Sequence, residues 1–133
     1  MLGIDVGSRR VGVAAADEET RFARPVEVID VERQDPIERI AQLVTEMGAS
    51  IVVVGKPIGL SGAEGPAVKV QADFVTRLRA ALGVAVEEFD ERLTTVLANR
   101  ALRASGVRPT DRKRLRDAIA AQVMLQGYLD STR

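Results

Sequence analysis

Four acidic residues occupy positions where carboxylates could take part in catalysis. Asp5 interrupts the apolar stretch at the start of the chain, and a buried ionised carboxylate is costly unless it is paired or binds a metal. Asp90 and Glu91 directly follow a predicted strand, and ligands gather at the carboxyl ends of parallel strands. Asp117 lies on the apolar stripe of the last predicted helix, beside small alanines that would let this helix approach a sheet closely.

Each of these positions also has a structural interpretation. Asp5 could cap the turn at Gly7, and Asp90 or Glu91 could cap the helix that follows. Asp117 could form a buried salt bridge with one of the arginines upstream of it. Taken together, the positions favour a shared site, because carboxylates from three separate elements could hold a pair of divalent ions. Such a pair activates a water and stabilises the leaving oxygen of a phosphodiester.

The composition restricts the chemistry further. The chain has no histidine and no cysteine. Ser-His-Asp triads, histidine bases, cysteine nucleophiles, thiolate-bound zinc and disulfides are therefore excluded. A metal would have oxygen ligands only, which predicts Mg²⁺ or Mn²⁺ as the cofactor.

Basic residues supply candidate contacts to a nucleic-acid backbone. The net charge is zero, with 19 basic and 19 acidic residues, so the overall balance does not indicate a nucleic-acid binder. One stretch near the C-terminus opposes a single acid, Asp111, with six basic residues: Arg103, Arg108, Arg112, Lys113, Arg114 and Arg116. Such a run can be a solvated helix face or a phosphate-binding surface. With one tyrosine and no tryptophan the chain offers little base stacking, which favours recognition of backbone and shape.

The elements that would position these residues begin with strands. Apolar stretches predict strands at 2–6, 10–16 and 22–31, and their short turns predict an antiparallel meander. Asp35-Pro36 begins a helix that ends at Gly48. The wholly apolar residues 51–54 predict a central parallel strand, followed by a glycine-rich loop at 55–66.

Helices and strands then alternate to the end of the chain. We predict a helix at 68–82, a strand at 84–89, and two further helices at 93–104 and 110–129. The order βββαβαβαα predicts an α/β fold, with a five-stranded mixed sheet and helices on both faces. The length of 133 residues is enough for one packed core, so a single domain spanning 1–133 is expected.

Four segments carry a resemblance to a known family: MLGIDVGSRRVGVAAAD, IVVVGKPIGLSGAEG, FDERLTTVLANRAL and RDAIAAQVMLQGYLD. In this order and spacing they resemble the YqgF/RuvX family over essentially the whole chain. The resemblance implies a ribonuclease H-like fold related to the Holliday-junction resolvases. It also implies a nuclease that matures the 5′ end of pre-16S ribosomal RNA.

The resemblance also assigns residues. It implies catalytic and metal-holding positions at Asp5, Glu91 and Asp117, with Asp5 between two ions and Asp90 as a neighbouring ligand or supporting residue. The loop that begins at Gly55-Lys56-Pro57 would form an edge of the substrate cleft. Phosphates near the cut are expected to contact Arg9, Arg10, Lys56 and Arg92, and more distant phosphates Arg112, Lys113, Arg114 and Arg116. The chain departs from the junction resolvases at Val54-Gly55, where they have an acid.

We therefore predict a cytoplasmic, metal-dependent nuclease that binds structured RNA. One alternative is a resolvase of branched DNA, which would act as a symmetric homodimer because two strands must be cut; monomer and homodimer both stay open. A second is a non-catalytic RNA-binding module of ribosome assembly. Sugar kinases and actin-like ATPases share the Asp-x-Gly strand but need two lobes. No apolar run reaches the roughly 18 residues of a membrane span, and the first residues lack a secretion signal.

Overall fold

A computed structural model of the chain describes residues 1–7, 9–56, 66–90 and 109–132, with the backbone alone at 56, 66–68, 90 and 109–115. The described strands are β1 (Leu2–Val6), β2 (Arg10–Ala16), β3 (Ala23–Asp30), β4 (Ile51–Lys56) and β5 (Ala85–Asp90). The described helices are α1 (Pro36–Met47), α2 (Pro66–Ala81) and α4 (Pro109–Ser131).

The five strands form one mixed sheet in the order β3-β2-β1-β4-β5. The first three strands are an antiparallel meander, since β2 pairs with β1 on one side and with β3 on the other. Strand β4 is parallel to both β1 and β5. The meander, the mixed sheet and the apolar strand near its centre were all predicted, and each is confirmed.

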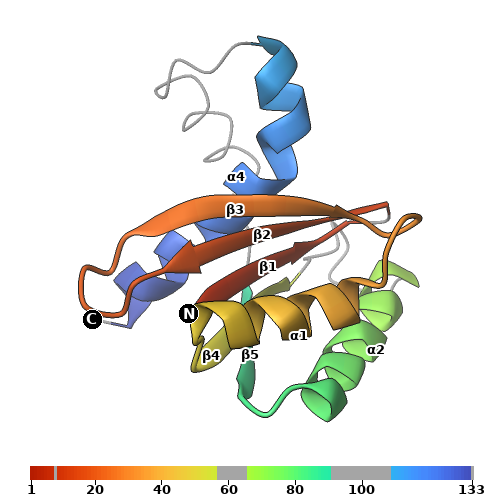
Figure 1. The fold of residues 1–133 in the computed structure, drawn as a ribbon, viewed down its shortest axis with the longest axis horizontal. Helices are drawn as coiled ribbons and strands as arrows, with labels where there is room; N and C mark the ends of the chain where they lie inside the picture. The colour runs from red at the N-terminus through yellow and green to blue at the C-terminus, as the bar shows by residue number, and fades with distance from the viewer. Residues whose placement is uncertain (8, 57–65, 91–108, 133) are drawn as a thin grey trace.

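Helices cover both faces of the sheet (Figure 1). Helices α1 and α2 lie on one face, and α4 lies on the other and extends past the edge of the sheet in this view. The α1/α2 side is packed around fully buried aliphatic residues such as Ile4, Ile40 and Leu78. The α4 side is a second buried cluster, made by small or medium-sized residues of two strands, β2 and β4, and by residues of α4: Ala14, Ala16, Val53, Ala121, Met124, Leu125 and Leu129. Alternate residues of one strand therefore contact different helices.

Helix α1 begins and ends as its sequence predicts. The Asp35 carboxylate accepts a hydrogen bond from the backbone N–H of Ile37 at 2.9 Å, and proline occupies the first turn. Gly48 ends the helix in the left-handed conformation, with φ of 63°.

Several predicted boundaries were wrong by one or two residues, among them boundaries of β4, α2 and β5. The glycine-rich loop was expected to begin at Gly55, but Gly55 and Lys56 belong to β4, because each pairs with a residue of β5. Helix α2 begins at Pro66 rather than at residue 68, since proline is favourable in a first turn. Strand β5 ends at Asp90, which was expected to follow it. The predicted helix at 93–104 lies outside the described residues.

Polar side chains fasten the C-terminal half of α4 to the rest of the fold. Gln122 donates to the carbonyl of Ala23 at 3.1 Å, and Gln126 accepts from the N–H of the same residue at 2.9 Å. Tyr128 donates a 2.5 Å hydrogen bond to the Glu87 carboxylate on β5, which raises the pKa of the tyrosine above its ordinary value. These hydrogen bonds connect α4 to β3 and β5, the strands at the two edges of the sheet, and so fix the position of the helix along its axis.

Candidate active site

Asp5 lies on the face of the sheet that α4 covers. It pairs directly with Gly12 of β2 in the antiparallel register, and directly paired residues present their side chains on one face. Gly3, two residues earlier on β1, shares that face, and a Cβ built on it would lie 2.8 Å from Cβ of Leu125. Asp5 is half-buried there. Its carboxylate therefore belongs to the layer between β1 and α4.

Of the sheet glycines whose contacts are described, Gly12 has α4 packed most closely against it. A Cβ on Gly12 would lie 1.9 Å from the carbonyl oxygen of Asp117 and 3.0 Å from the amide nitrogen of Ala118. Only a glycine leaves room for helix backbone against strand backbone at this distance. The cross-strand neighbour of Asp5 thus contacts the backbone of Asp117, so the strand pair that carries Asp5 packs directly against the helix turn that carries Asp117.

The Asp117 side chain has a basic partner from β2. The Nε of Arg10 lies 3.7 Å from Oδ2 of Asp117, and the two side chains are 52% and 32% exposed. The structural interpretation of Asp117 expected a salt bridge with an arginine just upstream on the same helix. The observed partner comes from a distant strand, and the pair is partly exposed rather than buried. Arg10 is also one of the residues expected to contact phosphate, and its observed partner is a predicted metal ligand.

The carboxyl ends of β4 and β5 lie next to each other, and β4 is also paired with β1. Lys56 and Asp90 are paired in the parallel register at the last residue of each strand. The buried side chain of Gln71 on α2, 4% exposed, donates to the carbonyl of Gly55 at 2.8 Å. This bond anchors α2 to the end of β4, next to the strand that carries Asp5.

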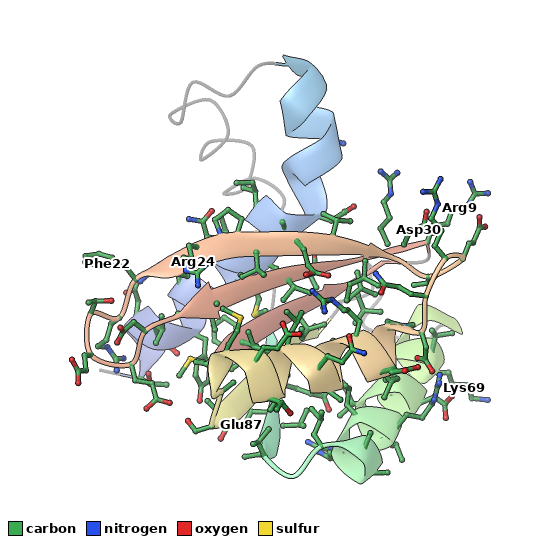
Figure 2. The ribbon with its side chains drawn as sticks, viewed as in Figure 1. Arg9, Phe22, Arg24, Asp30, Lys69 and Glu87 are labelled. Carbon is green, nitrogen blue, oxygen red and sulfur yellow. The ribbon has the colours of Figure 1, made fainter. Side chains whose placement is uncertain are left out.

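The other residues predicted to contact nucleic acid are described only in part. Arg9 is exposed, and its carbonyl accepts from the N–H of Val31 at 3.0 Å, which joins two neighbouring turns. Figure 2 shows Arg9 and Asp30 at one end of the molecule and Phe22 and Arg24 at the other. Arg116 is exposed on α4, and the backbone of 112–114 forms an earlier turn of that helix. Glu91 and Arg92 lie outside the described residues.

The predicted metal site is only partly covered by the described residues. Among residues 1–7, 9–56, 66–90 and 109–132, no three acidic, histidine or cysteine side chains gather as a candidate metal-binding group. Asp5 and Asp117 supply two of the three predicted ligands, and the third, Glu91, is not among these residues. Within the same ranges no helix is long and apolar enough to cross a membrane.

The role of the strand glycines was missed from the sequence. Gly3 and Gly12 are isolated glycines inside apolar strands, a pattern that indicates a bulge or a close approach of another backbone. That signal is present in LGIDV and RVGVAAA. It identifies a close contact without saying which element makes it.

Comparison with known proteins gives close relatives over the whole chain. A family described as "RuvX: Holliday junction resolvase" matches residues 1–131. A protein of Chloroflexus aggregans named "Putative pre-16S rRNA nuclease" is 46% identical over 100% of this chain and 94% of its own length. A protein of Anaeromyxobacter dehalogenans with the same name is 44% identical over 97% of this chain and 95% of its own.

Solved structures with similar folds have much lower sequence identity. The structure described as "T. thermophilus RuvC in complex with Holliday junction substrate" has a TM-score of 0.60 at 19% identity, covering 99% of this chain and 95% of that chain. A fowlpox virus resolvase with Holliday junction DNA has a TM-score of 0.57 at 13% identity, covering 98% and 97%. At these identities the likeness is one of fold, and it confirms the predicted ribonuclease H-like architecture.

Proposed function

Because the chain belongs to the RuvX family of Holliday junction resolvases, we propose that it is a nuclease whose active site lies between β1 and α4. The carrying observation is the contact of Gly12 with the Asp117 backbone, which brings the carboxylates of Asp5 and Asp117 to one face. Two carboxylates beside an exposed arginine match the parts needed for phosphodiester hydrolysis: ligands for a metal and a cation for the phosphate.

The donor chemistry fits a hard divalent cation. The available ligands are carboxylates from β1 and α4, in a chain without histidine or cysteine, and oxygen-only donor sets favour Mg²⁺ or Mn²⁺. Asp5, Asp117 and Glu91 would hold the metal. When bound, it supplies Lewis acidity and a water of lowered pKa. Asp90, at the end of β5, is assigned a supporting catalytic role next to Glu91.

Basic side chains of this chain would position the nucleic acid. Arg10 lies against Asp117 and is assigned to the phosphate at the cut, together with residues expected near it: Arg9, Lys56 and Arg92. The helix residues Arg112, Lys113, Arg114 and Arg116 are assigned to phosphates further along the backbone. Contacts of this kind give affinity that falls as salt rises and depends little on sequence.

The proposed substrate is the 5′ end of pre-16S rRNA. Relatives 42% to 46% identical over at least 97% of this chain carry the name "Putative pre-16S rRNA nuclease". We propose the same reaction for this chain, as one nuclease domain over residues 1–133 acting in the cytoplasm. Structured RNA also agrees with the scarcity of aromatic side chains for base stacking.

Branched DNA is the second candidate substrate. It is favoured by the family description and by the two similar folds solved with Holliday junctions. Resolution of a junction requires two opposed cuts, and therefore a dimer on the DNA. A change from monomer to dimer mass on adding four-way junction DNA would support this candidate over RNA processing.

The proposed function is tested by incubating the wild-type chain with labelled structured RNA and with four-way junction DNA. We expect RNA to be cleaved with Mn²⁺ or Mg²⁺ and to stay intact with EDTA, because the carboxylates cannot activate water without a metal. Preferential cleavage of the junction would select the resolvase. Binding of RNA without cleavage of either substrate, under any metal, would contradict the nuclease and support the non-catalytic module.

A further inference from the structure

We propose that Arg10 exchanges partners when the metal binds. Without metal its guanidinium pairs with the Asp117 carboxylate, and with metal in place it pairs with a phosphate of the substrate. This inference rests on the proposed function. It makes Arg10 a positioning residue that couples the binding of metal to the binding of nucleic acid.

The structure places Arg10 on β2, with its side chain in contact with Asp117 of α4. Its backbone is fixed, because its carbonyl accepts from the N–H of Gly7 at 2.9 Å and it pairs with Asp30 in the sheet register. Its side chain reaches Asp117, with 3.7 Å between Nε and Oδ2. Arg10 and Gly12 are two residues apart and therefore lie on the same face of β2. Gly12 is the direct cross-strand neighbour of Asp5. The guanidinium therefore contacts Asp117 from the same face of the sheet as Asp5.

The pair with Asp117 is weak enough to be exchanged. Both side chains are partly exposed, at 52% and 32%, and ion pairs of this kind change an equilibrium by only a few-fold. A divalent ion attracts a carboxylate more strongly than a guanidinium does at the same distance, since Coulomb energy scales with charge. It also repels the guanidinium. A metal at Asp117 would thus displace Arg10.

The displaced side chain has a new partner in the substrate. Arginine offers several N–H donors in a planar fork that matches the oxygens of a phosphate. Before the metal arrives, the same side chain offsets the charge of Asp117 and so reduces its repulsion with Asp5. Because coupling between two ligands is reciprocal, the metal would tighten nucleic-acid binding by the same factor as nucleic acid tightens metal binding.

The test measures Mn²⁺ binding in the absence of nucleic acid. Binding is detected as the loss of the electron paramagnetic resonance signal of free Mn²⁺. Removing the competitor in Arg10→Gln should lower the Mn²⁺ dissociation constant about three- to fivefold. Arg10→Lys, which keeps the charge, should bind Mn²⁺ within about twofold of wild type. The matched control is Arg9→Gln, which removes the same charge one residue away and should change Mn²⁺ affinity less than about twofold.

A second readout measures the coupling itself. With Ca²⁺, which binds oxygen donors, the factor by which the cation tightens structured-RNA binding should be smaller in Arg10→Gln than in wild type. Unchanged Mn²⁺ affinity in Arg10→Gln, or an equal change in Arg9→Gln, would overturn the exchange. Either of these two results would still be compatible with the proposed nuclease, provided that the wild type binds Mn²⁺ and cleaves RNA. A wild type that binds no Mn²⁺ and cleaves nothing would remove both.

Discussion

Asp5→Asn is expected to lower the rate of metal-dependent RNA cleavage by at least about 100-fold, since loss of mere supporting groups around a metal costs roughly 10–100-fold. Asparagine keeps the size of the side chain, so the half-buried position beside Gly12 should stay filled. RNA affinity should be retained, because it comes from basic residues that contact phosphates. Single-turnover cleavage and filter binding on the same RNA measure the two quantities.

The matched control for Asp5→Asn is Asp73→Asn. Asp73 is an exposed carboxylate on α2, and the substitution removes the same charge away from the α4 face. Its cleavage rate should stay within about twofold of wild type, as surface substitutions have small effects. Cleavage by Asp5→Asn at the wild-type rate would show that the reaction does not use this carboxylate. A loss of RNA binding in Asp5→Asn would instead assign Asp5 to substrate binding.

Gly12→Ala is expected to damage both stability and cleavage. The new Cβ would lie 1.9 Å from the Asp117 carbonyl oxygen, whereas ordinary contacts begin at 3.4 Å, so α4 must recede by 3.4 − 1.9 = 1.5 Å. Overpacking of this kind costs about 3 kcal/mol, measured as the free energy of unfolding in urea. Displacement of catalytic groups by about 1 Å can cost roughly 100-fold in rate. Cleavage should therefore fall even where the variant is fully folded.

Gly127→Ala is the control, because it adds the same methyl group on α4 itself, near the C-terminus of the helix and away from β2. Its Cβ would lie 3.4 Å from a ring carbon of Phe89, an ordinary contact. Replacing glycine by alanine inside a helix should stabilise the chain by up to about 1 kcal/mol. If Gly12→Ala has the stability and the activity of wild type, then α4 does not lie on β2 as described, and the carboxylates are not brought together by this contact.

Much of the fold could be predicted because its signals are local. The apolar stretches of the first strands, the cap at Asp35 and the glycine stop at Gly48 each depend on neighbouring residues. The apolar run in β4 indicated coverage on both faces, and α1, α2 and α4 provide it. Element ends were less accurate, since pairing with β5 extends β4 through Gly55 and Lys56.

The candidate site was only partly predictable. Asp5 and Asp117 could be selected because a charged residue in an apolar strand or stripe is costly without a partner. Their proximity could not be derived from periodicity, because it depends on the contact of α4 with Gly12. The Arg10–Asp117 pair joins residues at opposite ends of the sequence. The catalytic and nucleic-acid-binding roles of all the candidate residues, Asp5 and Asp117 included, stay predictions.

The central claim is that Asp5 and Asp117 share one metal site between β1 and α4. Iron-mediated cleavage of the protein backbone tests it most directly. Fe²⁺ bound in place of Mg²⁺ generates hydroxyl radicals with peroxide and ascorbate, and mass spectrometry locates the cuts. We expect cuts near Asp5, Gly12 and Asp117 in wild type, suppressed by excess Mg²⁺ and absent from Asp5→Asn. Cuts confined to other segments, or the same cuts in Asp5→Asn, would contradict the shared site.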